Sequence, residues 1–286
     1  MMRVTARRLI GGLAVATLAA VAGSSSQSSA SFSAQRANPG NSFAASTYFG
    51  FFASGSYTGN NIDNRAITGV GFRPDLVIVK GNTNQTSAAR TSSMSGDRSK
   101  PLSGGTALTA NIVQSLDAGG FTLGTNARVN GNGVGYEWMA FRAQDGLLRV
   151  GSYTGNGSAQ SISGLGFSPD YVAVFSAAGQ AAVQRYSGMT TSFSFNSNAG
   201  NATRITALGA DGFSVGNQNT VNASGTTYHW VALNEVPGAV DVGAYAGNGA
   251  DNRNVAGVGF QPQYVMVRAN DTATARISVH RPASLE

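Results

Sequence analysis

A block of about 93 residues recurs along this chain of 286 residues, twice in full and a third time in part. The stretch GFFASGSYTGN begins at Gly50, and it returns as GLLRVGSYTGN at Gly146 and as GAVDVGAYAGN at Gly238. A second motif, GVGFRPDLVIVK at 69–80, is also found three times, and a GF-turn motif and a Tyr-x-Trp motif each recur once in the same order. A period of this length is too long for one turn of a solenoid, so it predicts a small self-contained domain repeated in tandem.

Each recurring motif has the pattern of a short strand or of the turn beside it. Val77 and Val79 fall on one face of a strand, which we expect to be core. The equivalent valines, expected on the same kind of face, are Val172, Val174, Val265 and Val267. The Tyr-x-Trp strand at 136–141 is apolar on most of both faces and is expected to be central in its sheet. With 38 glycines and only 11% charged residues, the chain is predicted to be all-β, with a β-sandwich or jelly-roll-like domain in each repeat.

The repeat also sets the predicted domain boundaries: repeat 1 spans 49–145, repeat 2 spans 146–237, and a partial repeat 3 spans 238–286. We expect two similar sandwiches with four pairs of residues buried at equivalent positions. These pairs are Phe72 and Phe167, Val77 and Val172, Val79 and Val174, and Trp138 and Trp230. Repeat 3 holds too few strands to cover both faces of a sandwich. We therefore expect it to dock on repeat 2 or to pair with strands of a neighbouring molecule.

The N-terminus has the pattern of a secretory signal peptide. In residues 1–22, arginines are followed by an apolar stretch that is too short to span a bilayer comfortably. Cleavage after Ala22 or after Ala30 fits the small-residue rule, and an uncleaved membrane anchor is the alternative. Residues 23–48 are rich in Ser, Ala, Asn and Gly and are predicted to form a flexible leader. The mature protein is therefore expected to be secreted or displayed at the cell surface, with no membrane association after cleavage.

Composition argues against several functions. The formal net charge of +6 does not indicate a nucleic-acid partner, because the basic residues are scattered and form no run that would contact successive phosphates. The chain has no cysteine, which excludes disulfides and thiol nucleophiles. Only His229 and His280 could act as imidazole bases. His229 stands where repeat 1 has Glu137, which favours a polar strand position over a catalytic one.

The positions of four aspartates in the repeat favour structural roles in turns over catalysis or metal binding. Asp75 and Asp170 follow Gly-Phe-x-Pro and are expected to cap turns, with acid–base catalysis as the alternative. Asp63 and Asp251 are weak metal candidates, since their loops GNNIDNR and GNGADNR offer oxygen ligands of the kind that calcium prefers. The equivalent loop of repeat 2 has no carboxylate, which favours polar turns. We therefore predict a protein that is not an enzyme, with no catalytic residue, no cofactor and no metal site.

Aromatic residues at fixed places in the repeat have two interpretations. Such rings could stack on sugars, as in carbohydrate-binding modules, or they could pack in the core, which is the preferred interpretation for an aromatic that recurs on a strand. The residues concerned are Tyr57, Tyr153, Tyr245, Trp138 and Trp230. The pattern identifies no ligand-binding residue.

The repeat resembles a known but uncharacterised domain. SYTGNGSAQSISGLGFSPDYVAVF, followed by ADGFSVGN and GTTYHWVAL, is similar to a domain common in phage tail and virion-associated proteins, which implies a β-rich surface module without catalytic residues. The family's WIKNR segment is replaced here by IVKGN, VFSAA or MVRAN. In the leader, SFSAQRANPGNSFAA resembles TasA/camelysin-type biofilm fibre proteins.

These observations predict an exported, non-enzymatic surface or extracellular matrix protein that acts in adhesion or self-assembly through tandem β-domains. The alternative is a carbohydrate-binding module or a phage tail-like receptor-binding protein. The expected partners are further copies of the chain or a surface glycan.

Overall fold

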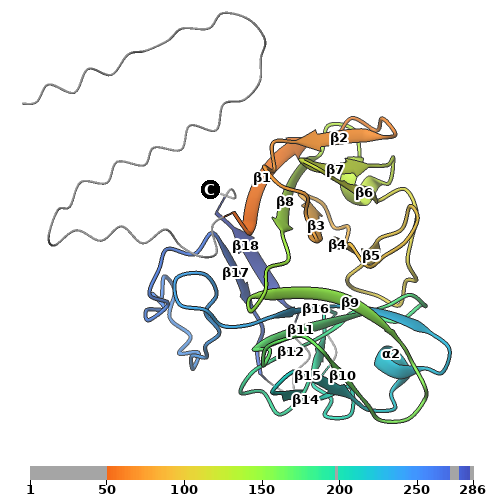
Figure 1. Ribbon diagram of the computed structural model, residues 1–286. Coiled ribbons are helices and arrows are strands. Elements are labelled where there is room, and N and C mark those ends of the chain that lie inside the picture. The colour runs from red at the N-terminus through yellow and green to blue at the C-terminus, as the bar shows by residue number, and fades with distance from the viewer. Residues whose placement is uncertain (1–49, 197–198, 271–276, 284–286) are drawn as a thin grey trace, which may run out of the picture. The chain divides into compact units, whose positions relative to one another are not determined.

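The computed structural model describes residues 50–196, 199–270 and 277–283 (Figure 1). The predicted signal peptide, 1–22, and the predicted leader, 23–48, lie outside the described residues. The described chain is almost entirely β, as predicted. Its two helices have four residues each, and none of the described helices is long and apolar enough to cross a membrane.

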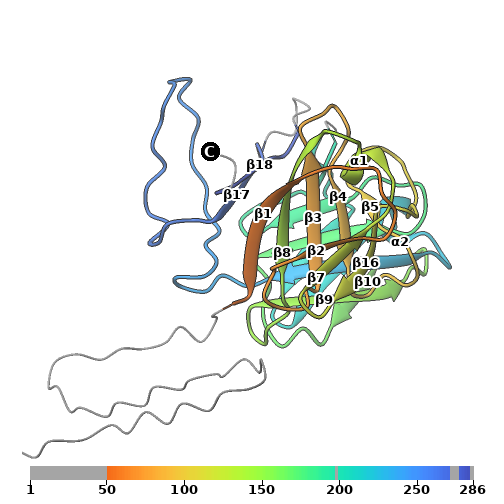
Figure 2. The ribbon, with the colours of Figure 1, turned by 90° about the horizontal axis from the view of Figure 1, so that it is seen from above.

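Repeat 1 forms two open antiparallel sheets. One has five strands in the order β1-β8-β3-β4-β5, and the other has three strands in the order β2-β7-β6. The elements are β1 (Phe52–Thr58), β2 (Arg65–Thr68), β3 (Leu76–Gly81), β4 (Ala88–Thr91), β5 (Lys100–Pro101), β6 (Val113–Asp117), β7 (Gly120–Leu123), α1 (Ala127–Asn130) and β8 (Gly135–Phe141). In Figure 2 the strands β1, β8, β3 and β4 lie side by side. The Tyr-x-Trp strand β8 is paired on both edges, so its predicted central position is confirmed.

Repeat 2 has the same topology. Its sheets run β9-β16-β11-β12-β13 and β10-β15-β14. The elements are β9 (Leu148–Thr154), β10 (Gln160–Ser163), β11 (Tyr171–Ser176), β12 (Val183–Tyr186), β13 (Phe193–Ser194), β14 (Ile205–Gly209), β15 (Gly212–Val215), α2 (Asn219–Asn222) and β16 (Thr227–Leu233). Strand for strand, this order reproduces the order of repeat 1, which confirms the predicted sandwich-like repeat.

Repeat 3 contributes one hairpin, β17 (Tyr264–Val267) with β18 (Val279–Pro282). Val267 pairs with Val279 as Val79 pairs with Ala88 in repeat 1. The hairpin therefore corresponds to β3–β4 and β11–β12. Within the described residues, β17 has β18 as its only neighbour in a sheet, whereas β3 and β11 are each paired on both edges.

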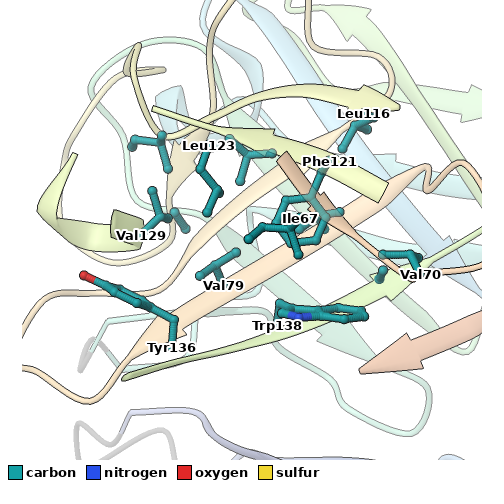
Figure 3. Packing of buried hydrophobic residues seen from close by; sticks show 14 of the residues in the cluster. Ile67, Val70, Val79, Leu116, Phe121, Leu123, Val129, Tyr136 and Trp138 are labelled. Carbon is teal, nitrogen blue, oxygen red and sulfur yellow. The ribbon is translucent and has the colours of Figure 1, made fainter. Parts of the chain in front are cut away.

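Each full repeat has its own apolar core between its two sheets. In repeat 1, Val77 and Val79 are fully buried against Ile67 and Phe121 of the smaller sheet. Figure 3 shows Val79, Phe121 and Trp138 in this core, where the rings of Phe121 and Trp138 meet edge to face at 5.8 Å. All four predicted residue pairs are buried in both repeats, which confirms that expectation.

Candidate functional site

The larger sheets have a second apolar face, directed away from the sandwich cores. On β3, Leu76 and Ile78 alternate with the core valines and join an apolar cluster with Met139 and Phe141 of β8. The equivalent residues of the other two repeats, Tyr171, Ala173, Tyr264 and Met266, belong to the same cluster. We call these eight residues the three-repeat cluster. The three repeats, which follow one another in the sequence, thus contribute to one shared apolar cluster.

The hairpin of repeat 3 docks against both full repeats. The ring of Tyr264 lies 6.3 Å from that of Phe52 and 5.9 Å from that of Phe141, both in repeat 1. From repeat 2, the side-chain amide of Gln184 donates to Ser278 Oγ. Also from repeat 2, the ring of Phe193 lies 4.7 Å from the Arg268 guanidinium of repeat 3. The expectation that the half repeat docks on repeat 2 is therefore incomplete, because the half repeat contacts repeat 1 as well.

The three-repeat cluster borders a cavity of about 890 Å³. Its apolar walls come from all three repeats and include Ile78, Met139, Phe175 and Met266. The β3–β4 connection at 81–87 supplies six polar residues of the lining, and the others are Lys80, Ser103, Glu137, Asn196, Ser278 and His280. This cavity between equivalent sheet faces is a candidate binding space.

The cavity is partly open to solvent, and most of its lining surface is apolar. Such a lining is suited to an apolar occupant.

The opposite face of the hairpin is exposed. Val265 and Val267 are 43% and 38% exposed, and Ile277 and Val279 are each 61% exposed. The prediction that Val265 and Val267 are core is therefore wrong: no second sheet covers β17 within the described residues. Tyr245 is also 48% exposed, for the same reason, although its equivalents in the full repeats are half-buried.

A buried lysine joins repeat 1 to repeat 2. Lys100 on β5 is fully buried, and its Nζ donates to the carbonyl oxygens of Thr106 at 2.7 Å, Ser176 at 2.8 Å and Ala178 at 3.1 Å. Burial lowers the pKa of Lys100 to about 8. Because two of its three acceptors lie in repeat 2, this side chain fixes the two repeats to each other.

His229 on β16 makes a second polar link between these repeats. Its Nδ1 lies 2.9 Å from Ser93 Oγ, and Ser93 Oγ in turn donates to the carbonyl oxygen of Gly151 at 3.0 Å. Ser93 Oγ also lies 2.9 Å from Thr91 Oγ1, so three groups share the single proton and the lone pairs of this hydroxyl. Burial, and secondarily the charge of Arg90, lowers the pKa of His229 to about 4.

Comparison with known proteins identifies the family. The model of a domain of unknown function, DUF7483, matches residues 45–147 and 189–279, which is more than half of the chain. The chain belongs to the DUF7483 family. The first DUF7483 segment covers repeat 1, and the second runs from within repeat 2 into repeat 3, which is consistent with a repeated domain. No curated protein and no solved structure matches the chain.

The DUF7483 match confirms the repeat but names no function. Neither the resemblance to phage tail and virion-associated proteins nor that of the leader to TasA-type fibres is supported by it, and both stay predictions. The leader resemblance also falls on residues outside the described part of the chain.

The two aspartates that follow Gly-Phe-x-Pro act as caps, but across the sheet. Asp75 accepts hydrogen bonds from the backbone N–H of Ala143 and from Ser92 Oγ, both at 2.8 Å. Asp170 accepts from the backbone N–H of Glu235 at 2.8 Å. The predicted turn cap is thus formed with a segment about 65 residues away, just after the central strand ends. Sequence spacing alone could not indicate that partner.

Replacing Asp75 with alanine should lower the free energy of unfolding by about 1–3 kcal/mol, because the Ala143 N–H loses its acceptor and the Ser92 hydroxyl loses its own. Urea unfolding followed by tryptophan fluorescence measures this change. Asp145→Ala is the matched control, since the Asp145 side chain is 91% exposed and pairs only with Arg149 at the surface. Equal stability of the two variants would contradict the capping role.

The metal candidates accept hydrogen bonds from protein groups. Asp63 accepts from the side-chain amides of Asn64 at 3.1 Å and of Gln114, on β6, at 2.9 Å. Asp251 accepts from the backbone N–H of Asn252 at 2.9 Å. In the described part of the chain, no group of three or more His, Cys, Asp or Glu side chains that could hold a metal ion is found.

The aromatic rings that recur in the full repeats are packed in the protein. Trp138 and Trp230 are buried in the two cores. Tyr57 and Tyr153 stack on Tyr136 and Tyr228, and the Tyr57 hydroxyl donates to the carbonyl oxygen of Val129 at 2.6 Å. These rings are therefore packed against protein groups. Tyr245 alone among the five candidates is exposed, and the Arg253 guanidinium lies 5.2 Å from the centre of its ring in a cation–π contact.

Proposed function

We propose that the chain is an exported, non-enzymatic surface or matrix protein that self-assembles through its tandem β-domains. The observation that carries this proposal is the hairpin of repeat 3. Within the described residues, β17 is paired on one edge, and its outward residues Val265 and Val267 are exposed apolar side chains. The export part of the proposal is supported by the signal-peptide pattern of residues 1–22.

The occupant that fits this surface is the hairpin of a second copy. The β17 sequence YVMV has no charge, proline or glycine, which are the features that prevent edge-to-edge pairing of strands. Two β17 edges that pair antiparallel would build one four-stranded sheet with twofold symmetry. The valines of both copies would then line one continuous face. The same pairing would add strands to a two-stranded hairpin, which is marginal alone.

The non-enzymatic part of the proposal is supported by how the polar candidates are used. Asp75 and Asp170 accept from backbone N–H groups, and His229 is hydrogen-bonded to Ser93, which also contacts the carbonyl oxygen of Gly151. Each of these groups has a structural task that explains its presence.

Light scattering of the full chain tests the assembly. The average mass should rise with concentration, and Val265→Lys should weaken association at least tenfold, because the substitution places two like charges at a paired edge. Ile62→Lys is the control: Ile62 is 61% exposed on a loop of repeat 1, so assembly should be unchanged. A chain that stays monomeric at all concentrations would refute self-assembly through β17.

A further inference from the structure

The cavity bordered by the three-repeat cluster has mainly apolar walls and a polar end at the β3–β4 connection. Leu76 and Ile78 on β3 precede Lys80 on the same face of the strand, so the lining changes from apolar to polar along the strand direction. At about 3.3 Å per residue, Leu76 and Lys80 lie about 13 Å apart along β3. The polar connection at 81–87 begins at the Lys80 end.

The charged groups at the polar end are already balanced. Lys80 Nζ donates to the carbonyl oxygens of Gly81 at 2.7 Å, Thr83 at 2.6 Å and Gln85 at 2.9 Å, which uses all three of its protons. Glu137 lies directly opposite Lys80 on the neighbouring strand β8. The positive and negative charges offset each other, so the cavity has no excess charge to offer a ligand.

His280 on β18 adds no charge near neutral pH. Its Nε2 lies 3.3 Å from Ser87 Oγ. Burial, followed by the nearby charge of Lys80, lowers the pKa of His280. A charged headgroup would therefore enter this end without a counter-charge, whereas an uncharged hydroxyl or amide would need only hydrogen bonds.

We propose that this cavity binds one molecule of an uncharged single-chain amphiphile, with its hydrocarbon chain between the three sheets and its head at the 81–87 connection. Cavities of this size and lining are typical of small-molecule sites, in which an apolar wall supplies affinity and a few polar groups set orientation. A dodecyl chain is comparable in length to the strand segment between Leu76 and Lys80. The site does not depend on β17 pairing, so it is independent of the proposed assembly.

Three probes with the same chain and different heads test the charge argument. Isothermal titration of the full chain with dodecanol, dodecanoate and dodecylammonium, each as dispersed monomer, measures affinity and stoichiometry. We expect one site per chain, with dodecanol bound at least tenfold more tightly than either charged probe. Absence of saturable binding by any probe would overturn the proposal, and tighter binding of a charged probe would overturn the assignment of an uncharged head.

Two substitutions on adjacent residues of β17 test the location. Met266→Trp fills the cavity and should weaken dodecanol binding at least tenfold, whereas Val265→Trp adds the same ring on the opposite, exposed face and should change it less than twofold. If Met266→Trp does not fold, Ile78→Phe fills the cavity from repeat 1 with the same expected direction. Equal binding by all variants would place the ligand elsewhere. Val265→Lys, which should lose assembly, should keep dodecanol binding, and this separates failure of the site from failure of the proposed function.

Discussion

Replacing Gly120 with alanine should lower the free energy of unfolding by about 3 kcal/mol or more. A Cβ atom at Gly120 would lie 1.9 Å from the carbonyl oxygen of Ile67 and 3.0 Å from its carbonyl carbon. Both atoms belong to the backbone of β2, which pairs with β7, so no side-chain rotation relieves the contact. The two strands would have to separate, and they belong to the sheet that covers Val77 and Val79. Urea unfolding of the purified chain measures the loss.

The neighbouring glycine is the control. A Cβ atom at Gly119 meets nothing within 4 Å, so Gly119→Ala should leave stability within about 0.5 kcal/mol of the original chain. If the two variants unfold at the same urea concentration, β2 and β7 are not in contact as described. Gly212 in repeat 2 meets the carbonyl oxygen of Ile162 at the same distance of 1.9 Å, so its substitution should have a similar effect.

This contact explains part of the sequence repeat in physical terms. GGFTLG and DGFSVG share the glycine that lets the two backbones approach, followed by a phenylalanine that fills the core. Because the recurring residues are those that a sandwich requires, the fold class, the repeat and the buried pairs could all be predicted from the sequence. The alternation of Val77 and Val79 was enough to assign their face.

The shared interior between the repeats could not be predicted in the same way. The alternation predicts that the valine face is core, but it does not say whether the other face, with Leu76 and Ile78, is buried or exposed. Apolar residues at the equivalent places in all three repeats were the available signal, but they do not say which surfaces meet. Val265 and Val267 show the opposite case, in which a face predicted to be core is exposed. Repeat 3 has the residue pattern of a core strand, but no sheet that would cover this face is among the described residues.

The polar contacts between repeats are even harder to predict from the sequence. Ser93 and His229 are 136 residues apart, and Lys100 meets carbonyl groups 76 and 78 residues away. Carbonyl acceptors belong to every residue, so no side-chain pattern marks them. Such contacts depend on how two domains pack against each other, which the residue pattern of a single strand does not specify.

The protein should lose stability as the pH falls from 6.5 to 4, in part because His229 resists protonation in the folded state. Its pKa is lowered to about 4 by burial and by Arg90, whereas an unfolded histidine titrates near 6.5. Between pH 6.5 and pH 4 the unfolded chain binds more protons than the folded chain. The free energy of unfolding therefore decreases as the pH is lowered, and this residue accounts for up to about 3 kcal/mol of the decrease. Above pH 6.5 both states hold a neutral imidazole and the contribution is constant.

His229→Gln isolates this effect from that of the carboxylates and of His280, which are common to both chains. Glutamine cannot take up a proton in this range, but its amide can still donate to Ser93 Oγ. Urea unfolding of both chains at several pH values between 7 and 4 should therefore give a shallower decline for the variant, by about 2–3 kcal/mol over the range. Parallel curves would mean that His229 is protonated as readily in the folded state as in the unfolded one. An NMR titration of the folded chain checks this directly, since the imidazole should change its signals near pH 4 instead of near pH 6.5.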